Sequence, residues 1–292
     1  MLSGRNVGRT VGSMIRRLLE FAANHVRARQ EETMRTTFTT IALALTLSAG
    51  AAAAAEIRVL CVGSTQVAAK ALAADFTKQN GRTVTVTATA PFNIDKELTA
   101  KPFDLLIISM PAVEAYDEAG SLRPGTRTAL ARVGVGLVVK QGATVPDIST
   151  PEAFKKAVLA AKSITHSDPA VPNLAGAVAA AAFAKAGILD EVKAKTRYAG
   201  LAAGGELVAK GEIEMGFFNL SEIPPGLTVA GPVPASLRSY TFYEAGVLAK
   251  GAAHEPASAF VKFMASAGAG KVWRDAGLEP AADYQPTRAS TN

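Results

Sequence analysis

The chain has 292 residues, of which 49% are hydrophobic and 19% are charged, and it carries a formal net charge of +6 with a single cysteine. Seven of its 31 Lys and Arg residues and three of its 25 Asp and Glu residues fall within residues 1–55, which leaves 24 basic and 22 acidic residues and a net charge of +2 for residues 56–292. This near balance of charges lacks the basic excess that binds nucleic acid, and the sequence has no polybasic patch for a membrane surface. We therefore expect neither nucleic acid nor a membrane as a partner.

Residues 34–55 have the composition of a secretory signal peptide. Arg35 gives a basic start, residues 41–47 are apolar, and a run of alanines precedes Glu56. The apolar run is too short to anchor the chain stably across a bilayer. We therefore expect cleavage near Ala55 and export of the remaining chain to the periplasm.

Residues 1–33 are rich in arginine and have no strong apolar core. Because secretory signals normally begin close to the initiator, we interpret this segment as an upstream extension, with Met34 in place of Met1 as the start of translation. The alternative is a twin-arginine signal built on Arg16 and Arg17. Charged residues, however, interrupt the apolar segment that would have to follow those arginines directly.

From residue 57 onward, apolar strand-like runs alternate with alanine-rich helical runs, which is typical of strands joined by crossover helices. Strands are expected within residues 57–62, 83–89, 103–109, 134–140, 162–167, 214–220 and 244–250. Helices are expected within residues 65–79, 94–99, 112–119, 151–161, 174–186, 205–210 and 255–267. Thr150 and Pro151 form a capping residue and a first-turn proline, which mark one helix start well. The pattern predicts an α/β fold.

Cys61 lies inside the apolar run IRVLCV, and no internal disulfide is possible. A lipid-attached cysteine would have to end the apolar signal core, but Glu56 and Arg58 stand between the two. We expect a buried thiol on a strand, since free cysteine is among the most buried residue types.

The length of the exported chain predicts two lobes, because the alternation continues beyond the usual size of one core. We expect crossings near residues 132–134 and 234–240. Lobe 1 would then comprise residues 56–133 and 237–292, and lobe 2 residues 134–236. Two crossings of this kind permit hinge closure around a ligand in the cleft between the lobes.

The order of the segments resembles the periplasmic solute-binding proteins of ABC importers, in the group that includes the molybdate-binding proteins. The segments that carry this resemblance are IRVLCVGSTQ, FDLLIIS, ARVGVGLVVKQGA, DISTPEAFKKAVLAAKSITHSDPA, AKGEIEMGFFNLSEI and FVKFMASAGAGKVWRDAGLEP. The resemblance covers residues 56–288. It implies the two-lobed, type II periplasmic binding protein fold, a small anionic ligand in the interlobe cleft, and the permease of an ABC transporter as partner.

In the first lobe, the resemblance places ligand-binding donors at Ser64 and Thr65, at the start of a helix whose free N–H groups favour an anion. Ser64 would alternatively cap that helix. The second family serine falls where this chain has Pro91 and Phe92, and proline has no N–H to donate. Asn93 would replace it, either as a ligand or as the cap of the next helix.

In the second lobe, the resemblance points to backbone donors at Asn173 or Ala175 and at Ala203 or Gly204. Glycine allows a backbone amide to approach a ligand closely, although Gly204 and its neighbouring glycine would alternatively make a helix start. A tyrosine of the family is replaced here by Asn219, which can both donate and accept.

These departures indicate a ligand other than molybdate, either a small carboxylate or another oxyanion. Arg132 and Arg238 lie near the expected crossings, and arginine suits carboxylate recognition. A solvated surface role is the alternative for both side chains.

The chain offers little enzyme chemistry. His166, Ser167 and Asp168 are adjacent in sequence, whereas a working triad is assembled across space. We expect no metal site, no cofactor and no catalytic residue, and a monomer that delivers its ligand to a transporter. The alternatives are a binding subunit that serves a sensor and a secreted enzyme.

Overall fold

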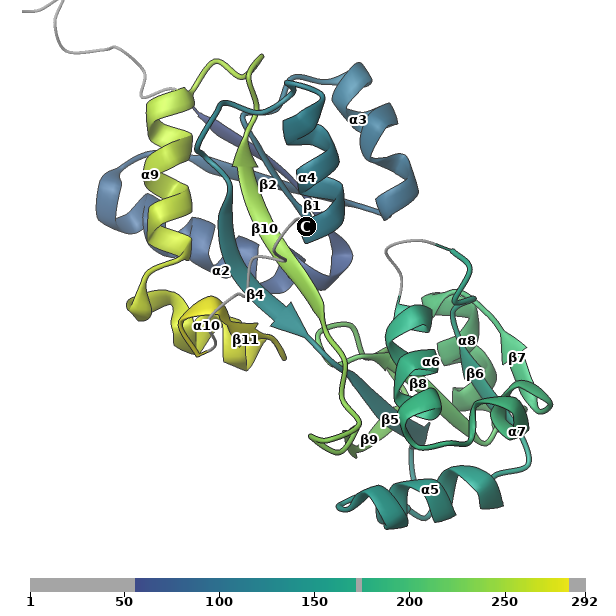
Figure 1. Ribbon diagram of the computed structural model, residues 1–292. Coiled ribbons are helices and arrows are strands. Elements are labelled where there is room, and N and C mark those ends of the chain that lie inside the picture. The colour runs from purple at the N-terminus through teal and green to yellow at the C-terminus, as the bar shows by residue number, and fades with distance from the viewer. Residues whose placement is uncertain (1–55, 172–174, 284–292) are drawn as a thin grey trace, which may run out of the picture. The chain divides into compact units, whose positions relative to one another are not determined.

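The computed structural model describes residues 56–171 and 175–283, in which two β-sheets each carry their own helices and core (Figure 1). Within these described ranges, no helix is both long enough and apolar enough to cross a membrane. The predictions for residues 1–33, for the signal peptide at 34–55 and for Asn173 concern residues outside the described ranges.

The first sheet has six strands in the order β11-β4-β10-β3-β1-β2. Their bounds are β1 Ile57–Val62, β2 Val84–Thr89, β3 Leu105–Ser109, β4 Thr128–Val133, β10 Thr241–Val247 and β11 Glu279–Pro280. Strand β1 pairs in parallel with β2 and β3, whereas β10 is antiparallel to β3 and β4. The helices of this part are α2 Gly63–Asn80, α3 Ile94–Ala100, α4 Met110–Glu118, α9 His254–Met264 and α10 Gly270–Asp275, with short 3-10 turns at Pro91–Asn93, Ala267–Ala269 and Ala281–Asp283.

Helix cover explains why the central strands of the six-stranded sheet are continuously apolar. All five residues of β3 are buried, as expected for a strand covered on both faces. Helix α2 packs against α9 through Phe76, whose ring centroid lies 5.1 Å from that of Phe260 and 5.4 Å from that of Phe263. Cys61 is fully buried in β1, as the sequence predicted.

The second sheet has five strands in the order β7-β6-β8-β5-β9. Their bounds are β5 Val135–Lys140, β6 Ile164–His166, β7 Thr196–Tyr198, β8 Met215–Asn219 and β9 Leu227–Pro232, and the helices of this part are α5 Pro151–Ala160, α6 Ala175–Lys185, α7 Leu189–Lys193 and α8 Leu201–Lys210. Thr150 caps α5 by accepting the Ala153 N–H at 3.1 Å, which confirms the predicted helix start. The core centres on Phe183 and Phe217, whose centroids lie 4.9 Å apart edge to face.

The chain passes between the sheets twice. Gly134 is the only residue between β4 and β5, and residues 233–240 join β9 to β10. The side chain of Arg238 lies so close to Gly134 that a Cβ at this glycine would stand 3.2 Å from the arginine Cδ. Because Gly134 has no side chain, the Arg238 side chain can pack against the backbone between β4 and β5.

Arg132 and Arg238 meet at these crossings without lining the cavity described below. Glu279 of β11 pairs with Arg132 at 2.7 Å and with Arg238 at 3.4 Å. The Arg132 guanidinium also lies 3.9 Å from the centre of the Tyr240 ring. Both arginines therefore have partners that tie the two connections to the C-terminal strand.

Within residues 56–171 and 175–283, each strand expected from the sequence is present, and four further strands were missed. The missed strands are β4, β7, β9 and β11, and the missed helices are α7 and α10. The expected helix at 205–210 begins earlier, at Leu201. Gly204 and Gly205 therefore lie inside the helix, and the interpretation that they make its start was wrong.

Candidate functional site

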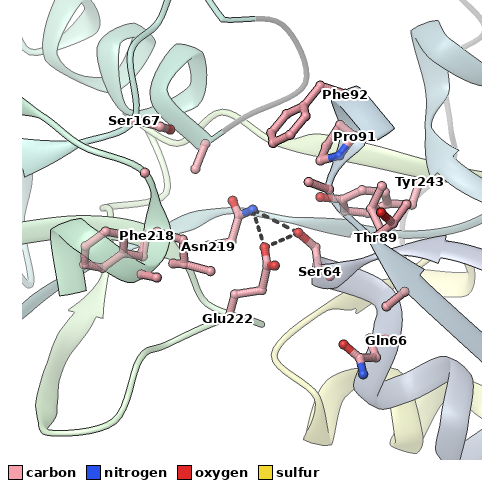
Figure 2. A pocket seen from close by; sticks show the side chains of 18 of the residues that line it. Ser64, Gln66, Thr89, Pro91, Phe92, Ser167, Phe218, Asn219, Glu222 and Tyr243 are labelled. Atoms are coloured by element: carbon pink, nitrogen blue, oxygen red, sulfur yellow. Dashed lines mark hydrogen bonds between the residues drawn. The ribbon is translucent and has the colours of Figure 1, made fainter. Parts of the chain in front are cut away.

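Residues from both sheets and their loops line one cavity of about 650 Å³. Its wall combines the start of α2, the loop after β2, the start of α8, the end of β8 and the loop that follows β8 (Figure 2). Polar side chains in this wall are those of Ser64, Gln66, Thr89, Ser167, Asn219, Glu222 and Tyr243. The rest of the lining is small or apolar.

A three-membered hydrogen-bond cluster joins α2 to the loop after β8. The Ser64 hydroxyl donates to the Glu222 carboxylate. The Asn219 amide nitrogen donates to the Ser64 hydroxyl oxygen at 3.1 Å and to the same Glu222 oxygen at 3.2 Å. Figure 2 shows the three side chains converging from opposite sides of the cavity floor.

The Glu222 carboxylate lies against Gly63, the first residue of α2. This helix begins at Gly63, has no acidic residue in its first turn, and receives no side-chain bond from its cap residue Val62. A Cβ added at Gly63 would collide with the second carboxylate oxygen of Glu222. Glycine at this position therefore allows the carboxylate to approach the free N–H groups and the positive end of the helix dipole.

Tyr243 of β10 closes the wall behind this cluster. Tyr243 is 3% exposed, and its hydroxyl lies close to Ser64. Burial, together with the nearby negative charge of Glu222, raises the pKa of Tyr243, although the neighbouring Ser64 hydroxyl opposes the rise. Tyr243 is thus a neutral phenol at physiological pH.

The wall on the side of the five-stranded sheet offers hydrogen-bond donors. Helix α8 begins at Leu201 without an acidic residue in its first turn and without a side-chain cap, so the first N–H groups have no acceptor within the helix. The Ser167 oxygen accepts the Gly176 N–H at 2.8 Å, which leaves the Ser167 hydroxyl hydrogen to donate elsewhere. This wall is therefore suited to a negatively charged ligand.

Pro91 and Phe92 form part of the rim above the cavity (Figure 2). The Phe92 side chain is 76% exposed, which is unusual for a large aromatic residue. Its ring is available to cover a bound ligand.

The structure brings together four of the eight residues that the resemblance suggested. Ser64, Ala175, Ala203 and Asn219 line the cavity. The other three described residues are not among the lining residues: Thr65, Asn93 and Gly204. Thr65 is fully buried and donates to the Val62 carbonyl at 3.1 Å, and Gly204 packs against the ring of Phe218.

The capping alternative for Ser64 was wrong, because Ser64 is the second residue of α2 and Val62 is its cap residue. Asn93 does stand at the cap position of α3, although its side chain makes no bond to that helix. Ser64 instead uses its hydroxyl across the cavity floor, toward Glu222.

Sequence reasoning missed Glu222, which is the only acidic residue among the described residues that line the cavity. It stands in NLSEI, directly after β8, at the end of a strand where binding residues of α/β folds gather. A carboxylate at that position was the available signal, but its partner Ser64 lies far away in the sequence.

The adjacent residues His166, Ser167 and Asp168 do not form a triad. The His166 Nδ1–H donates to the Ser167 carbonyl at 2.8 Å, and Asp168 accepts the Ala170 N–H at 2.9 Å. Within the part of the chain that the structure describes, no three His, Cys, Asp or Glu side chains gather in a way that could hold a metal ion.

Known proteins share both the sequence pattern and the fold. The family model described as bacterial extracellular solute-binding protein matches residues 57–279. This chain belongs to that family. A curated relative, an aconitate isomerase from Pseudomonas sp, is 30% identical to this solute-binding protein over 182 residues, which cover 62% of this chain and 68% of the relative.

Solved structures show that the solute-binding protein has the two-lobed α/β fold of periplasmic binding proteins. The substrate-binding domain of a molybdenum ABC transporter from Clostridium difficile superposes with a TM-score of 0.64 at 19% identity, covering 77% of this chain and 98% of that one. The periplasmic molybdate-binding protein of Azotobacter vinelandii gives a TM-score of 0.60 at 20% identity, covering 76% and 98%. The expected resemblance to molybdate-binding proteins is confirmed at the level of fold.

Proposed function

We propose that the protein captures a small organic anion, a carboxylic acid, in the cavity and delivers it in the periplasm to the permease of an ABC transporter. The observation that carries this proposal is the donor-rich wall at the start of α8, which faces the same cavity as Ser167 and Thr89. Family membership supports the role of carrier.

The anionic ligand would be held by backbone N–H groups and the helix dipole in place of positively charged side chains. Among the described residues that line the cavity, none is Lys or Arg. Backbone N–H groups at a helix start bind anions well because they point at the ligand and carry the positive end of the helix dipole. Such a site holds an anion without the strong, slow-releasing pairs that arginine forms, which suits a protein that must hand its ligand over.

The size of the cavity favours an organic acid over a tetrahedral oxyanion. A volume of about 650 Å³ equals that of roughly twenty water molecules. A five-atom oxyanion would fill only a small part of it and would leave polar wall groups without partners. The aromatic rim residue Phe92 adds apolar surface that an organic acid can cover.

The two connections at Gly134 and residues 233–240 support closure as the source of affinity, because each side of the cavity supplies only part of the ligand's hydrogen bonds. The permease would recognise the closed, ligand-bound form. A ligand-binding subunit of a sensor would use the same cavity and the same closure.

Thermal unfolding of the full-length chain tests the proposal. Small mono-, di- and tricarboxylates, sulfate and molybdate would each be added at a series of concentrations. A specific ligand present at a hundred times its dissociation constant should stabilise the folded state by about 2.7 kcal/mol. Stabilisation by carboxylates supports the proposal, whereas stabilisation by molybdate alone would contradict it.

A second candidate function is isomerisation of aconitate, favoured by the Glu222 carboxylate in the cavity wall and by the relative named aconitate isomerase. Glu222 would take a proton from the CH₂ group of aconitate, the electron pair would shift the double bond by one carbon, and the same proton would return at the other end. No co-reactant is needed.

This second function is tested by incubating the protein with trans-aconitate and following the cis isomer by NMR. Turnover that is lost in Glu222→Gln and kept in Glu206→Gln would support isomerisation, because Glu206 is an exposed carboxylate paired with Lys210 outside the cavity. Binding without turnover would leave the protein as a carrier.

A further inference from the structure

The amide of Asn219 has one satisfied side and one unsatisfied side. Its nitrogen donates to Ser64 and Glu222. This orientation is fixed chemically, because an ionised carboxylate only accepts hydrogen bonds and would repel the amide oxygen. The oxygen Oδ1 is buried and has no hydrogen-bond partner.

An orphaned acceptor of this kind is uncommon and costs free energy. Asn219 is only 7% exposed, and it belongs to the cavity wall. In Figure 2 its oxygen points away from Ser64 and Glu222, toward the space between Ser167 and Phe92. The oxygen is enclosed in this structure, so a ligand in the cavity would contact it once the neighbouring wall side chains move aside, and only a hydrogen-bond donor on the ligand would satisfy it.

The Glu222 carboxylate adds a second acceptor beside the first. It already accepts hydrogen bonds from Ser64 and Asn219 and lies against Gly63, the first residue of α2, so an anion that approaches this helix start would meet its negative charge. A tetrahedral oxyanion would have to displace it or sit beside it, and two negative charges at such short range repel each other.

We propose that the cavity selects carboxylic acids that also carry a hydroxyl or ammonium donor, because Asn219 Oδ1 and the Glu222 carboxylate form an acceptor pair that such a donor satisfies. The proposal rests on the proposed function and specifies its ligand class. The carboxylate of the ligand faces the N–H groups at Leu201–Ala203, and the donor faces Asn219 and Glu222. Tetrahedral oxyanions are excluded by Glu222.

The experiment is calorimetric titration of the full-length chain with acids matched in size and differing in the donor. Malate is compared with succinate and citrate with tricarballylate, and aspartate with succinate separates ammonium from hydroxyl. The donor-bearing acid of at least one pair should bind about tenfold more tightly or better, since a hydrogen bond to a charged acceptor contributes that much. Equal affinities within every pair would overturn the inference.

Two variants and one control variant locate the effect. Asn219→Leu should reduce the discrimination within the favoured pair, whereas Glu206→Gln should keep it. Glu222→Gln, which preserves side-chain shape, should lose discrimination and gain binding of sulfate or molybdate. Oxyanion binding by the wild type as tight as carboxylate binding would contradict the role of Glu222.

The results also separate this inference from the proposed function. If neither acid of any pair binds, the proposed function is wrong and the inference fails with it. If both acids of each pair bind equally, the proposed function stands and the inference alone is wrong.

Discussion

The hydroxyl of Ser64 donates a hydrogen bond to the carboxylate of Glu222, 158 residues further along the chain. The bond links the first turn of α2, beside the six-stranded sheet, to the loop after β8 of the five-stranded sheet. The floor of the cavity is thus built from both parts of the fold, and a substitution at either residue removes a hydrogen-bond partner of the other.

Removal of the Ser64 hydroxyl should lower stability. Ser64 is 7% exposed, and its substitution by alanine leaves the Glu222 carboxylate with Asn219 as the remaining side-chain donor. A lost hydrogen bond to a charged group costs about 1.5–3 kcal/mol, so urea denaturation should show a decrease of that order for Ser64→Ala. The control is Ser266→Ala, whose hydroxyl donates to the Phe263 carbonyl at an exposed position. Equal stability of Ser64→Ala and wild type would show that the bond does not form in solution.

Phe92 should matter for binding and not for folding. Because its side chain is 76% exposed, Phe92→Ala should change the free energy of unfolding by no more than about 0.5 kcal/mol. The same substitution should weaken binding of the carboxylate that stabilises the protein in thermal unfolding, since the Phe92 ring lines the cavity rim. Val229→Ala, an exposed change away from the cavity, is the matched control for both titration and denaturation. Unchanged affinity in Phe92→Ala would remove this residue from the site.

Buried His166 should make the protein less stable in mild acid. Burial lowers the pKa of His166, although its bond to the Ser167 carbonyl and the charge of Asp168 oppose the change. As the pH falls below about 6.5, the unfolded chain binds a proton that folded His166 does not yet accept, so stability decreases until the lowered folded pKa is reached.

Denaturation midpoints across this pH window check the prediction for His166. In His166→Gln, stability should decrease less than in the wild type as the pH falls from about 6.5 toward the lowered pKa of folded His166. Above about pH 7, the stability of both proteins should change with pH in the same way. A slope in His166→Gln as steep as that of the wild type would assign the pH dependence to other groups.

Cys61 should resist thiol reagents while the protein is folded. The residue is 0% exposed, and burial raises the pKa of its thiol to about 11. Both features suppress the reactive thiolate. A chromogenic disulfide reagent should therefore label the chain slowly in buffer and rapidly in denaturant. Rapid labelling of the native protein would mean that β1 opens readily.

The sequence predicted the parts of the fold that have strong local patterns. Continuous apolar runs located β1, β3 and β8, and the Thr150–Pro151 pair located the start of α5. Strand β4 was missed because Thr128–Val133 mixes polar and apolar residues, and its pairing with β10 depends on partners more than a hundred residues away. Strand β7 has only three residues, too few for a periodic signal.

The candidate site was predicted only in part, through the resemblance to a known family. Ser64 and Asn219 were identified through that resemblance, and both line the cavity. No local sequence pattern identifies Glu222 as a site residue, because its place in the site depends on its contact with Ser64, which is distant in the sequence. The capping alternative for Ser64 failed because α2 begins one residue earlier, at Gly63, whereas Asn93 stands at the cap position of α3 without a side-chain capping bond.

The most direct test of the proposed binding site is to fill the cavity with a large side chain and to measure ligand binding by titration. Calorimetry would compare wild type, Ala203→Trp and Ala143→Trp for binding of the carboxylate that stabilises the full-length chain most. Ala203 lines the cavity at the start of α8, whereas Ala143 is an exposed turn residue outside it. We predict one bound ligand per chain for wild type and Ala143→Trp, and no measurable binding for Ala203→Trp. Wild-type affinity in a folded Ala203→Trp variant would show that the ligand binds elsewhere.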